Sequence, residues 1–274
     1  MKQFLIRTAT GAAYVAVMVF CTVFRPWTLL VLVLLLSLLA VWELARICCA
    51  DGRHAMNRLL LTCSAIALPI AVYFSCRLPD VNVLLLFTPY LLVLLLSFIV
   101  ELYARHEDPV GNMGLLALAQ VYVVLPLSLF PLLAFAPLQA EGRAFWTLPL
   151  ALYVFLWLYD SGAYLIGSWL GRHKLFPRIS PGKTWEGSIG GAAVALGAAA
   201  VLARFFPFMS LWRWMELALV VVVFGTWGDL TESLIKRTLG LKDSGKLLPG
   251  HGGILDRIDS MLFAIPAAVI YLCF

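Results

Sequence analysis

Long apolar runs with almost no charge recur along this sequence, and they restrict its fold more than any other feature. They cover about residues 8–24, 27–42, 59–76, 83–100, 113–136, 144–159, 187–206, 214–228 and 260–274. A helix needs roughly 20 apolar residues to cross a bilayer. In lipid each backbone polar group must be satisfied internally, which favours helices. The sequence therefore predicts an all-α, polytopic membrane protein with about nine transmembrane helices.

Composition agrees with a membrane protein and excludes some partners. The chain is 62% hydrophobic and 13% charged, with a mean hydropathy of +0.95, whereas a soluble domain is about half apolar and about one quarter charged. The net charge of +5 comes without a Lys/Arg run that would follow a nucleic-acid backbone. An anionic lipid surface or a phosphorylated substrate is the better match.

The distribution of cations predicts the orientation. The first run follows Lys2 and Arg7 as a signal peptide does, but it has no clear small-residue cleavage site, so we expect a retained anchor. With nine spans and an inside N-terminus, fifteen of the twenty Lys and Arg residues fall on one face. Because Lys and Arg accumulate on the cytoplasmic side, we expect this face and the N-terminus to be cytoplasmic.

The chain divides into two regions by the length of its polar connections. Residues 1–143 hold closely spaced apolar runs, for which we expect an anchoring role. Residues 144–274 add two long polar loops on the predicted cytoplasmic face, at 160–186 and 229–259. Long loops among short ones are more often functional than structural, so we expect the active site there.

The first loop offers groups suited to phosphate. Ser180, Lys183 and Thr184 flank a Pro-Gly turn directly before the next apolar run, and a helix start with free N–H groups attracts phosphate oxygens. This is not a Walker A loop, because a proline stands where the leading glycine belongs. The alternative is a solvated basic loop. Asp160, after a long apolar run, either faces a partner or a wet cavity or marks a helix end.

Carboxylates at the ends of the second loop suggest a metal. Asp229 ends one apolar run and Asp256 begins the next, so antiparallel helices bring both to one edge. Asp256 and Asp259 are three residues apart and share a helix face. Hard oxygen ligands without Cys or His suit Mg²⁺, which leaves other positions to water and phosphates. The sequence predicts Asp229, Asp256 and Asp259 as metal ligands.

Further residues of this loop complete the predicted site. We expect Lys236 to be a catalytic residue together with the three aspartates. His251 either donates a hydrogen bond to a phosphate or caps the glycine-rich turn. Asp243 is a site candidate whose alternative is a structural role. Four cations suit the neutralisation of phosphate charge: Lys236, Arg237, Lys242 and Arg257.

These loops carry a resemblance to a known family. The stretches 233–237 (SLIKR), 242–244 (KDS) and 248–259 (LPGHGGILDRID) resemble the signature of CDP-diacylglycerol synthases, or phosphatidate cytidylyltransferases. The stretches 160–164 (DSGAY) and 179–187 (ISPGKTWEG) resemble that family's second conserved block. The similarity covers roughly 157–262, whereas the N-terminal half shares only its hydrophobic, multi-spanning character.

The resemblance implies an activity and its partners. It implies transfer of the cytidylyl group of CTP to phosphatidate, giving CDP-diacylglycerol and pyrophosphate for phospholipid biosynthesis. It also implies a two-cation site with Mg²⁺ and a second ion of open identity. A homodimer, a bacterial inner (plasma) membrane location, and a lipid-path or dimer role for the N-terminal helices follow as expectations.

Two other functions are compatible with parts of the sequence. A CTP-dependent polyprenol kinase is distantly similar in its C-terminal region. A cation-coupled transporter would use the acidic residues as its ion site, but such sites tend to lie near the bilayer midplane, whereas these charges gather at one edge.

Overall fold

The structure is a computed structural model that describes residues 2–48, 55–104, 106–135, 144–245, 247 and 252–273. Within these residues each predicted apolar run is helical, and seven helical segments are long and apolar enough to cross a membrane. α1 contains a shorter apolar stretch, Thr8–Val23. α11 is not among the seven segments, because Asp256, Arg257 and Asp259 lie in its first two turns. The all-α, polytopic prediction is confirmed. The longer helices are α1 (Lys2–Val23), α2 (Pro26–Cys48), α3 (Ala55–Arg77), α4 (Val83–Ala104), α8 (Thr147–Leu170), α9 (Trp185–Phe205), α10 (Leu211–Thr238) and α11 (Leu255–Cys273).

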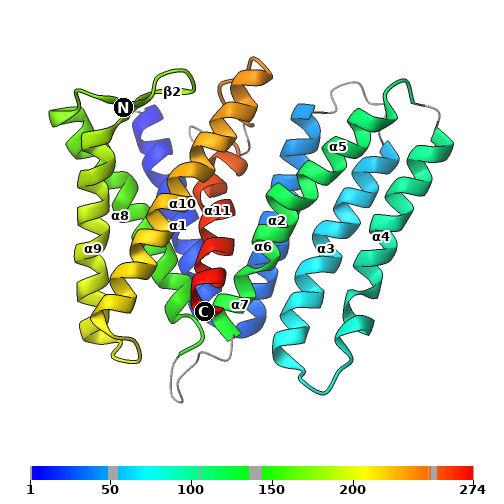
Figure 1. The fold of residues 1–274 in the computed structure, drawn as a ribbon, viewed down its shortest axis with the longest axis horizontal. Helices are drawn as coiled ribbons and strands as arrows, with labels where there is room; N and C mark the ends of the chain where they lie inside the picture. Colours follow the sequence, from blue (N-terminus) through cyan, green and yellow to red (C-terminus); the bar gives the residue numbers. More distant parts are fainter. Residues whose placement is uncertain are drawn as a thin grey trace. The chain divides into compact units, whose positions relative to one another are not determined.

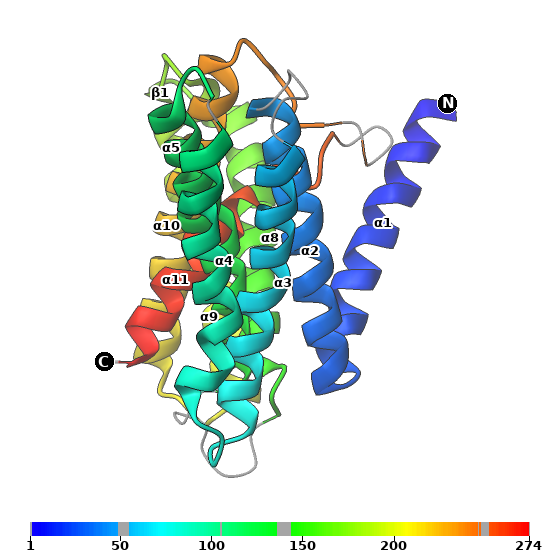
Figure 2. The same ribbon diagram turned by 90° about the vertical axis from the view of Figure 1, so that its right-hand side faces the viewer.

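The chain forms two compact units. The first consists of residues 1–136 and 243–257, and the second of 137–242 and 258–274. In the first unit α2, α3, α4 and α5 (Pro109–Ala119) pack side by side (Figure 2). The first unit also includes residues 243–257. These residues belong to the second predicted loop, in which we expected the active site together with the C-terminal helices.

The predicted span 113–136 is a helix with an irregular middle. It is built from α5 (Pro109–Ala119), the π-helix η1 (Gln120–Val124), α6 (Leu125–Ser128) and α7 (Phe130–Phe135). Pro126 lacks an N–H group, which favours such an interruption. Gln120, in the π-helix, donates to the Ser64 hydroxyl at 2.7 Å and accepts from the Tyr90 hydroxyl at 3.3 Å. These bonds join α3, α4 and η1.

In the second unit α8, α9 and α10 pack together (Figure 1). Glycines let α8 and α9 approach closely: a Cβ atom at Gly191 would lie 2.6 Å from the Tyr159 carbonyl oxygen, and one at Gly187 would lie 2.7 Å from the Ala163 carbonyl oxygen. Ala195 and Ala199 continue the buried face of α9. The sequence predicts such packing from these small residues, and the structure confirms it.

A short antiparallel hairpin, which the all-α prediction lacks, precedes α9. Strand β1 (Lys174–Phe176) pairs with β2 (Ser180–Thr184). Glu186, in the first turn of α9, accepts the backbone amides of Arg172 at 3.1 Å and His173 at 3.2 Å, and its carboxylate lies 2.5 Å from the His173 ring nitrogen Nδ1. The hairpin is therefore tied at its base to the helix that follows it.

The two predicted loops are shorter than the sequence suggests. α8 continues to Leu170 and α10 continues to Thr238, so Asp160 and Asp229 lie on helices. The loops begin later than their predicted bounds because hydropathy marks the part of a helix in hydrocarbon, whereas the backbone hydrogen bonds continue into the polar layer.

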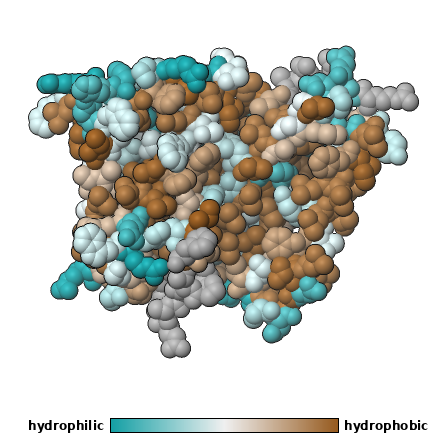
Figure 3. Space-filling view, viewed as in Figure 1, coloured by the Kyte–Doolittle hydropathy of each residue, from teal (hydrophilic) through white to brown (hydrophobic). Residues whose placement is uncertain are grey.

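The outer helix faces are apolar. Figure 3 shows hydrophobic side chains over the midsections of helices and hydrophilic ones mainly near their ends. On α4, the buried residues are the polar Ser97 and Glu101, whereas Leu84, Leu85 and Leu95 are exposed. An apolar exterior is expected of a protein whose solvent is lipid.

Replacing Gly191 by alanine should loosen the α8–α9 contact. The added methyl group would meet the Tyr159 carbonyl oxygen at 2.6 Å, and overpacking costs about 1–3 kcal/mol. We expect Gly191→Ala to lower the melting temperature of the detergent-purified protein. Gly197→Ala, on the same helix with nothing within 4 Å of its new methyl group, is the control and should not lower it. Equal melting temperatures for the two variants would contradict the packing role of Gly191.

Candidate active site

An ion pair joins the hairpin to α10. The Lys183 ammonium on β2 lies 2.5 Å from the Asp229 carboxylate, and both side chains are about one quarter exposed. Burial disfavours the charged ammonium, but the Asp229 carboxylate outweighs this effect and raises the pKa of Lys183 above its ordinary value. Lys183 therefore stays charged at neutral pH. The structure brings together a predicted phosphate-binding cation and a predicted metal ligand.

Two more carboxylates act on this pair. Asp160 contributes to the electrostatic environment of Lys183, and Asp160, Asp229 and Lys183 all contribute to that of Asp259. Three carboxyl groups therefore share the surroundings of one ammonium. Oxygen atoms of carboxyl groups are the ligands that a divalent cation such as Mg²⁺ takes in proteins.

Close backbone packing places Asp259 beside α10. A Cβ atom at Gly228 would lie 2.5 Å from the Asp259 carbonyl oxygen, so α10 and α11 meet directly before Asp229. At the other end of these helices, the Tyr271 hydroxyl donates to the Glu216 carboxylate at 2.7 Å. The two contacts fix α10 and α11 in antiparallel register, which the sequence predicts for the helices that carry these aspartates.

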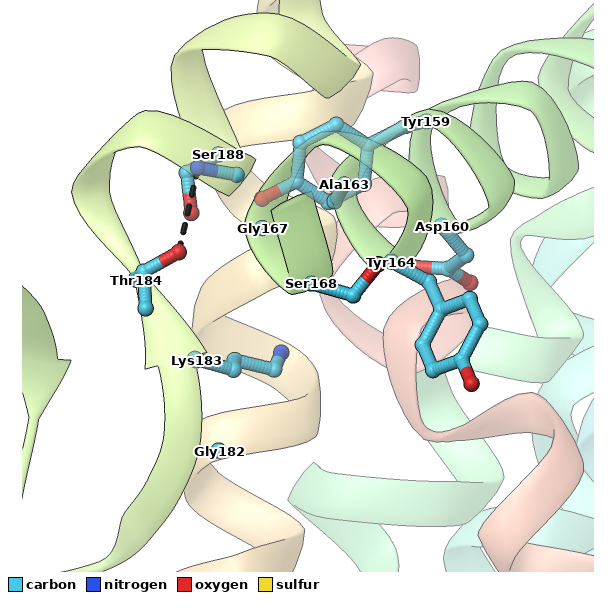
Figure 4. Close-up of a pocket in the computed structure, with 11 residues that line it drawn as sticks. Tyr159, Asp160, Ala163, Tyr164, Gly167, Ser168, Gly182, Lys183, Thr184 and Ser188 are labelled. Atoms are coloured by element: carbon cyan, nitrogen blue, oxygen red, sulfur yellow. Dashed lines mark hydrogen bonds between the residues drawn. The ribbon is translucent and has the colours of Figure 1, made fainter. Parts of the chain in front are cut away.

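A polar cavity of about 360 Å³ opens beside Lys183. Its wall comes from α8, β2 and the start of α9, and Figure 4 shows Lys183 on one side with Asp160 and Tyr164 on the other. Ser168 and Ser188 add hydroxyl groups. Of the two alternatives for Asp160, the structure places it at the wall of a cavity, within α8 and not at the end of that helix.

An apolar cavity of about 490 Å³ adjoins the polar one. Side chains of β1, α9 and α10 line it, among them Phe176, Leu219 and Val223. Tyr159 and Ser188 line both cavities, and the Thr226 hydroxyl donates to the Tyr159 hydroxyl at 2.7 Å. A ligand with a polar head and an apolar tail would match the two cavities together.

Thr184 and Ser180 have backbone roles in the hairpin. The Thr184 hydroxyl accepts the Gly187 amide at 3.1 Å and so caps α9 (Figure 4), as threonine does at many helix starts. Thr184 is buried, and Ser180 starts β2 opposite Phe176. Of the three phosphate candidates in the first loop, Lys183 and Thr184 line the polar cavity.

Three cations of the second loop, Lys236, Arg237 and Lys242, lie on or just after the last turns of α10. Lys236 is 2.5 Å from the buried carboxylate of Glu232, one turn earlier, and Arg237 donates to the Leu241 carbonyl oxygen at 3.3 Å. Lys242 is exposed after the helix end. Their predicted contacts with phosphate remain predictions.

Asp256, Arg257 and Asp243 belong to the first unit. The Asp256 carboxylate accepts the Ser244 amide at 3.0 Å and the Gly253 amide at 2.7 Å. Gly252 has a φ of 85°, a conformation that favours glycine. Arg257 and Asp243 are exposed. His251 lies outside the described residues.

The predicted metal ligands are hard oxygen donors, which suits Mg²⁺. Among the residues that the structure describes, no group of three or more His, Cys, Asp or Glu side chains forms a ready cation site. Asp229 and Asp259 do share one electrostatic environment. The metal and its ligand set therefore stay a prediction.

Two residues escaped the sequence-based selection. Tyr159 directly precedes the motif at 160–164 and was not chosen as a site residue, although it lines both cavities. Glu43 lies buried near the end of α2 and accepts hydrogen bonds from Ser244 and Leu255. A charged residue directly after an apolar run was the signal that could have found it.

Comparison with known proteins agrees with this geometry. Proteins named phosphatidate cytidylyltransferase are similar to the chain: 52% identical over 118 residues in Staphylococcus aureus (strain COL), and 50% over 118 residues in Staphylococcus haemolyticus (strain JCSC1435). Each alignment covers 42% of this chain and 45% of the relative, so the chain spans slightly less than half the length of the curated relatives it matches. The model of the cytidylyltransferase family matches residues 5–274. The chain therefore belongs to the cytidylyltransferase family.

Proposed function

We propose that this membrane protein transfers the cytidylyl group of CTP to phosphatidate, giving CDP-diacylglycerol and pyrophosphate. The observation that carries the proposal is the polar cavity beside Lys183 and Asp229, which shares Tyr159 with an apolar cavity. Phosphatidate is an amphiphile with a phosphate monoester head, and it suits this pair of cavities. The names of the relatives support the same reaction.

The chemistry requires positioning and charge neutralisation. An oxygen of the phosphatidate phosphate attacks the α-phosphorus of CTP, a new P–O bond forms, and the bond to the β-phosphate oxygen breaks with release of pyrophosphate. A phosphate dianion is already a nucleophile, so no covalent enzyme intermediate is needed. Lys183 orients phosphate oxygens at the wall of the polar cavity, and Lys236, Arg237 and Lys242 neutralise the polyphosphate.

Divalent cations fit the carboxylates of the site. The carboxyl groups of Asp160, Asp229 and Asp259 around Lys183 support a divalent ion there. Asp229 and Asp259 would hold Mg²⁺, with Asp256 on the same helix as Asp259 as the third candidate. A bound Mg²⁺ would supply charge stabilisation for the cytidylyl group during its transfer. Lys183, at the wall of the polar cavity, would bind phosphate oxygens.

The location follows from the substrates. CTP is dissolved in the cytoplasm, whereas the acyl chains of phosphatidate stay in the bilayer. A charged cavity at the cytoplasmic edge of the inner membrane lets both meet, and the positive-inside pattern supports this orientation. A homodimer remains part of the proposal only by analogy with the family.

Labelled CTP tests the reaction itself. With purified protein, phosphatidate and Mg²⁺, we expect label on the α-phosphate to enter the lipid and label on the γ-phosphate to leave as pyrophosphate. Thin-layer chromatography of the lipid and aqueous products reads both. Entry of the γ-label into lipid would show a kinase instead.

Neutralising either partner of the Lys183–Asp229 pair should stop the reaction with little effect on folding. We expect Lys183→Met and Asp229→Asn each to lower kcat by about 10²–10³-fold, the usual effect of losing a preorganised charge at a transition state. The double variant should be no worse than the singles, because residues that act as a unit are not additive.

Matched controls lie at exposed positions away from the two cavities. Arg204→Met on α9 and Asp80→Asn, which follows α3, remove charges of the same signs, and they should keep kcat within about twofold, as expected of surface changes away from the site. If Lys183→Met keeps wild-type kcat, or if the two single losses multiply in the double variant, the pair does not act as proposed.

Removal of divalent cations tests the metal. A chelator should abolish turnover and added Mg²⁺ should restore it, whereas Ca²⁺, with its longer and more variable coordination, should restore less. We expect Asp259→Asn to raise the Mg²⁺ concentration for half-maximal activity. Full activity in the presence of chelator would refute the metal-dependent mechanism.

A further inference from the structure

Glu43 is an unusual residue of the first unit. It lies near the end of the apolar helix α2, and only 1% of its surface is exposed. A buried carboxylate in a membrane helix is costly and usually functional. Its oxygen Oε2 accepts the Leu255 amide at 2.9 Å and the Ser244 hydroxyl at 3.2 Å. An N-terminal helix thus contacts the segment that carries the family signature, and both contacts lie within one unit.

The signature segment, meaning the described residues 243–245 and 252–257, leaves space for this carboxylate. A Cβ atom at Gly245 would lie 2.5 Å from Glu43 Oε1, and one at Gly253 would collide with Glu43 Oε2. Glycine at both positions lets the backbone approach the carboxylate closely. The glycines of the signature therefore have a partner in the N-terminal half of the chain.

Ser244 connects Glu43 to Asp256. The Ser244 hydroxyl donates to Glu43, and the Ser244 amide donates to the two Asp256 oxygens at 3.1 and 3.0 Å. The Gly253 amide donates to Asp256 Oδ2 at 2.7 Å. One serine thus links two carboxylates, and Glu43 also binds the amide of Leu255 at the start of α11, directly before Asp256.

The second oxygen of Glu43 has a different environment. Oε1 has no hydrogen-bond partner among the described residues, although buried polar atoms nearly always have one. Stability alone does not favour such an arrangement, because an unsatisfied buried acceptor is destabilising. A residue retained at a cost to stability is expected to serve the site.

We propose that Glu43 is a positioning residue that fixes the Asp256 carboxylate, through Ser244 and the first turn of α11, in the orientation that the reaction needs. Glu43 itself does not touch substrate. The catalytic consequence rests on the proposed function, whereas the structural link rests on the hydrogen bonds alone.

Hydrogen exchange tests the structural link without any substrate. In the purified full chain, we expect Glu43→Leu to speed exchange in peptides that contain Ser244, Gly253 and Leu255 by about tenfold or more, as loss of hydrogen bonds to a charged group predicts. Glu101→Leu is the matched control. Glu101 is also buried in the first unit, but it contacts Asn57, His106 and Asn112, so exchange near Ser244 should not change. Unchanged exchange in Glu43→Leu would overturn the proposal, whatever the activity.

Kinetics test the consequence for the reaction. We expect Glu43→Leu to lower kcat at least tenfold and to raise the Mg²⁺ concentration for half-maximal activity, with KM for CTP nearly unchanged. Glu43→Gln, which keeps an oxygen acceptor, should recover part of kcat. Glu101→Leu should leave the Mg²⁺ requirement unchanged even if it lowers the melting temperature.

Hydrogen exchange and kinetics together distinguish a failure of the Glu43 proposal from a failure of the proposed function. If exchange rises in Glu43→Leu but kcat and the Mg²⁺ requirement stay at wild-type values, the positioning role is wrong. If exchange rises as expected while the wild-type protein turns over no CTP, the proposed function fails and the link from Glu43 to Asp256 stands.

Discussion

Lipid as the solvent dictates how this protein can hold charged residues. The backbone must satisfy its own hydrogen bonds, so the spans are helices, and charged side chains are confined to helix ends or to partnered positions. α10 shows the result: its apolar part is followed by Asp229, Lys236 and Arg237 within the same helix. The carboxylate nearest the apolar part is the one that pairs with Lys183. The hairpin supplies this partner from outside the helix bundle.

Small residues determine where these helix ends meet. Gly191 brings α9 against the backbone of α8, and Gly228 brings α10 against the backbone of α11. Both contacts lie next to residues of the polar cavity or its carboxylates. Tight packing close to the charges limits the side-chain motion that would otherwise let water screen them. The apolar spans are thus part of the site, because they set the distances between its charged groups.

The sequence predicted the spans well and the contacts between distant residues only in part. Hydropathy located every long helix, and the glycines near residue 190 predicted close helix packing without naming the partner, which is α8. It placed the starts of the two polar loops at Asp160 and Asp229, several residues before α8 and α10 end, because polar residues in a helix beyond the hydrocarbon look like loop residues. It also missed the hairpin and the pairing of Lys183 with Asp229, which depend on tertiary contact rather than on local pattern. Glu43 was overlooked because its partners, Ser244 and Leu255, lie some 200 residues later.

The position of Tyr159 has an evolutionary consequence. Its ring forms part of the wall of both cavities, while its hydroxyl is held by Thr226. For the proposed lipid substrate, a substitution there would change the surface offered to the head group and to the alkyl chain at once, so the two selectivities could not change independently at this position. Residues that line one cavity alone, such as Leu219 and Val223, are free of this restriction. In proteins that descend from this one, substitutions that alter the preference for an alkyl chain should therefore occur on α10 before they occur at Tyr159.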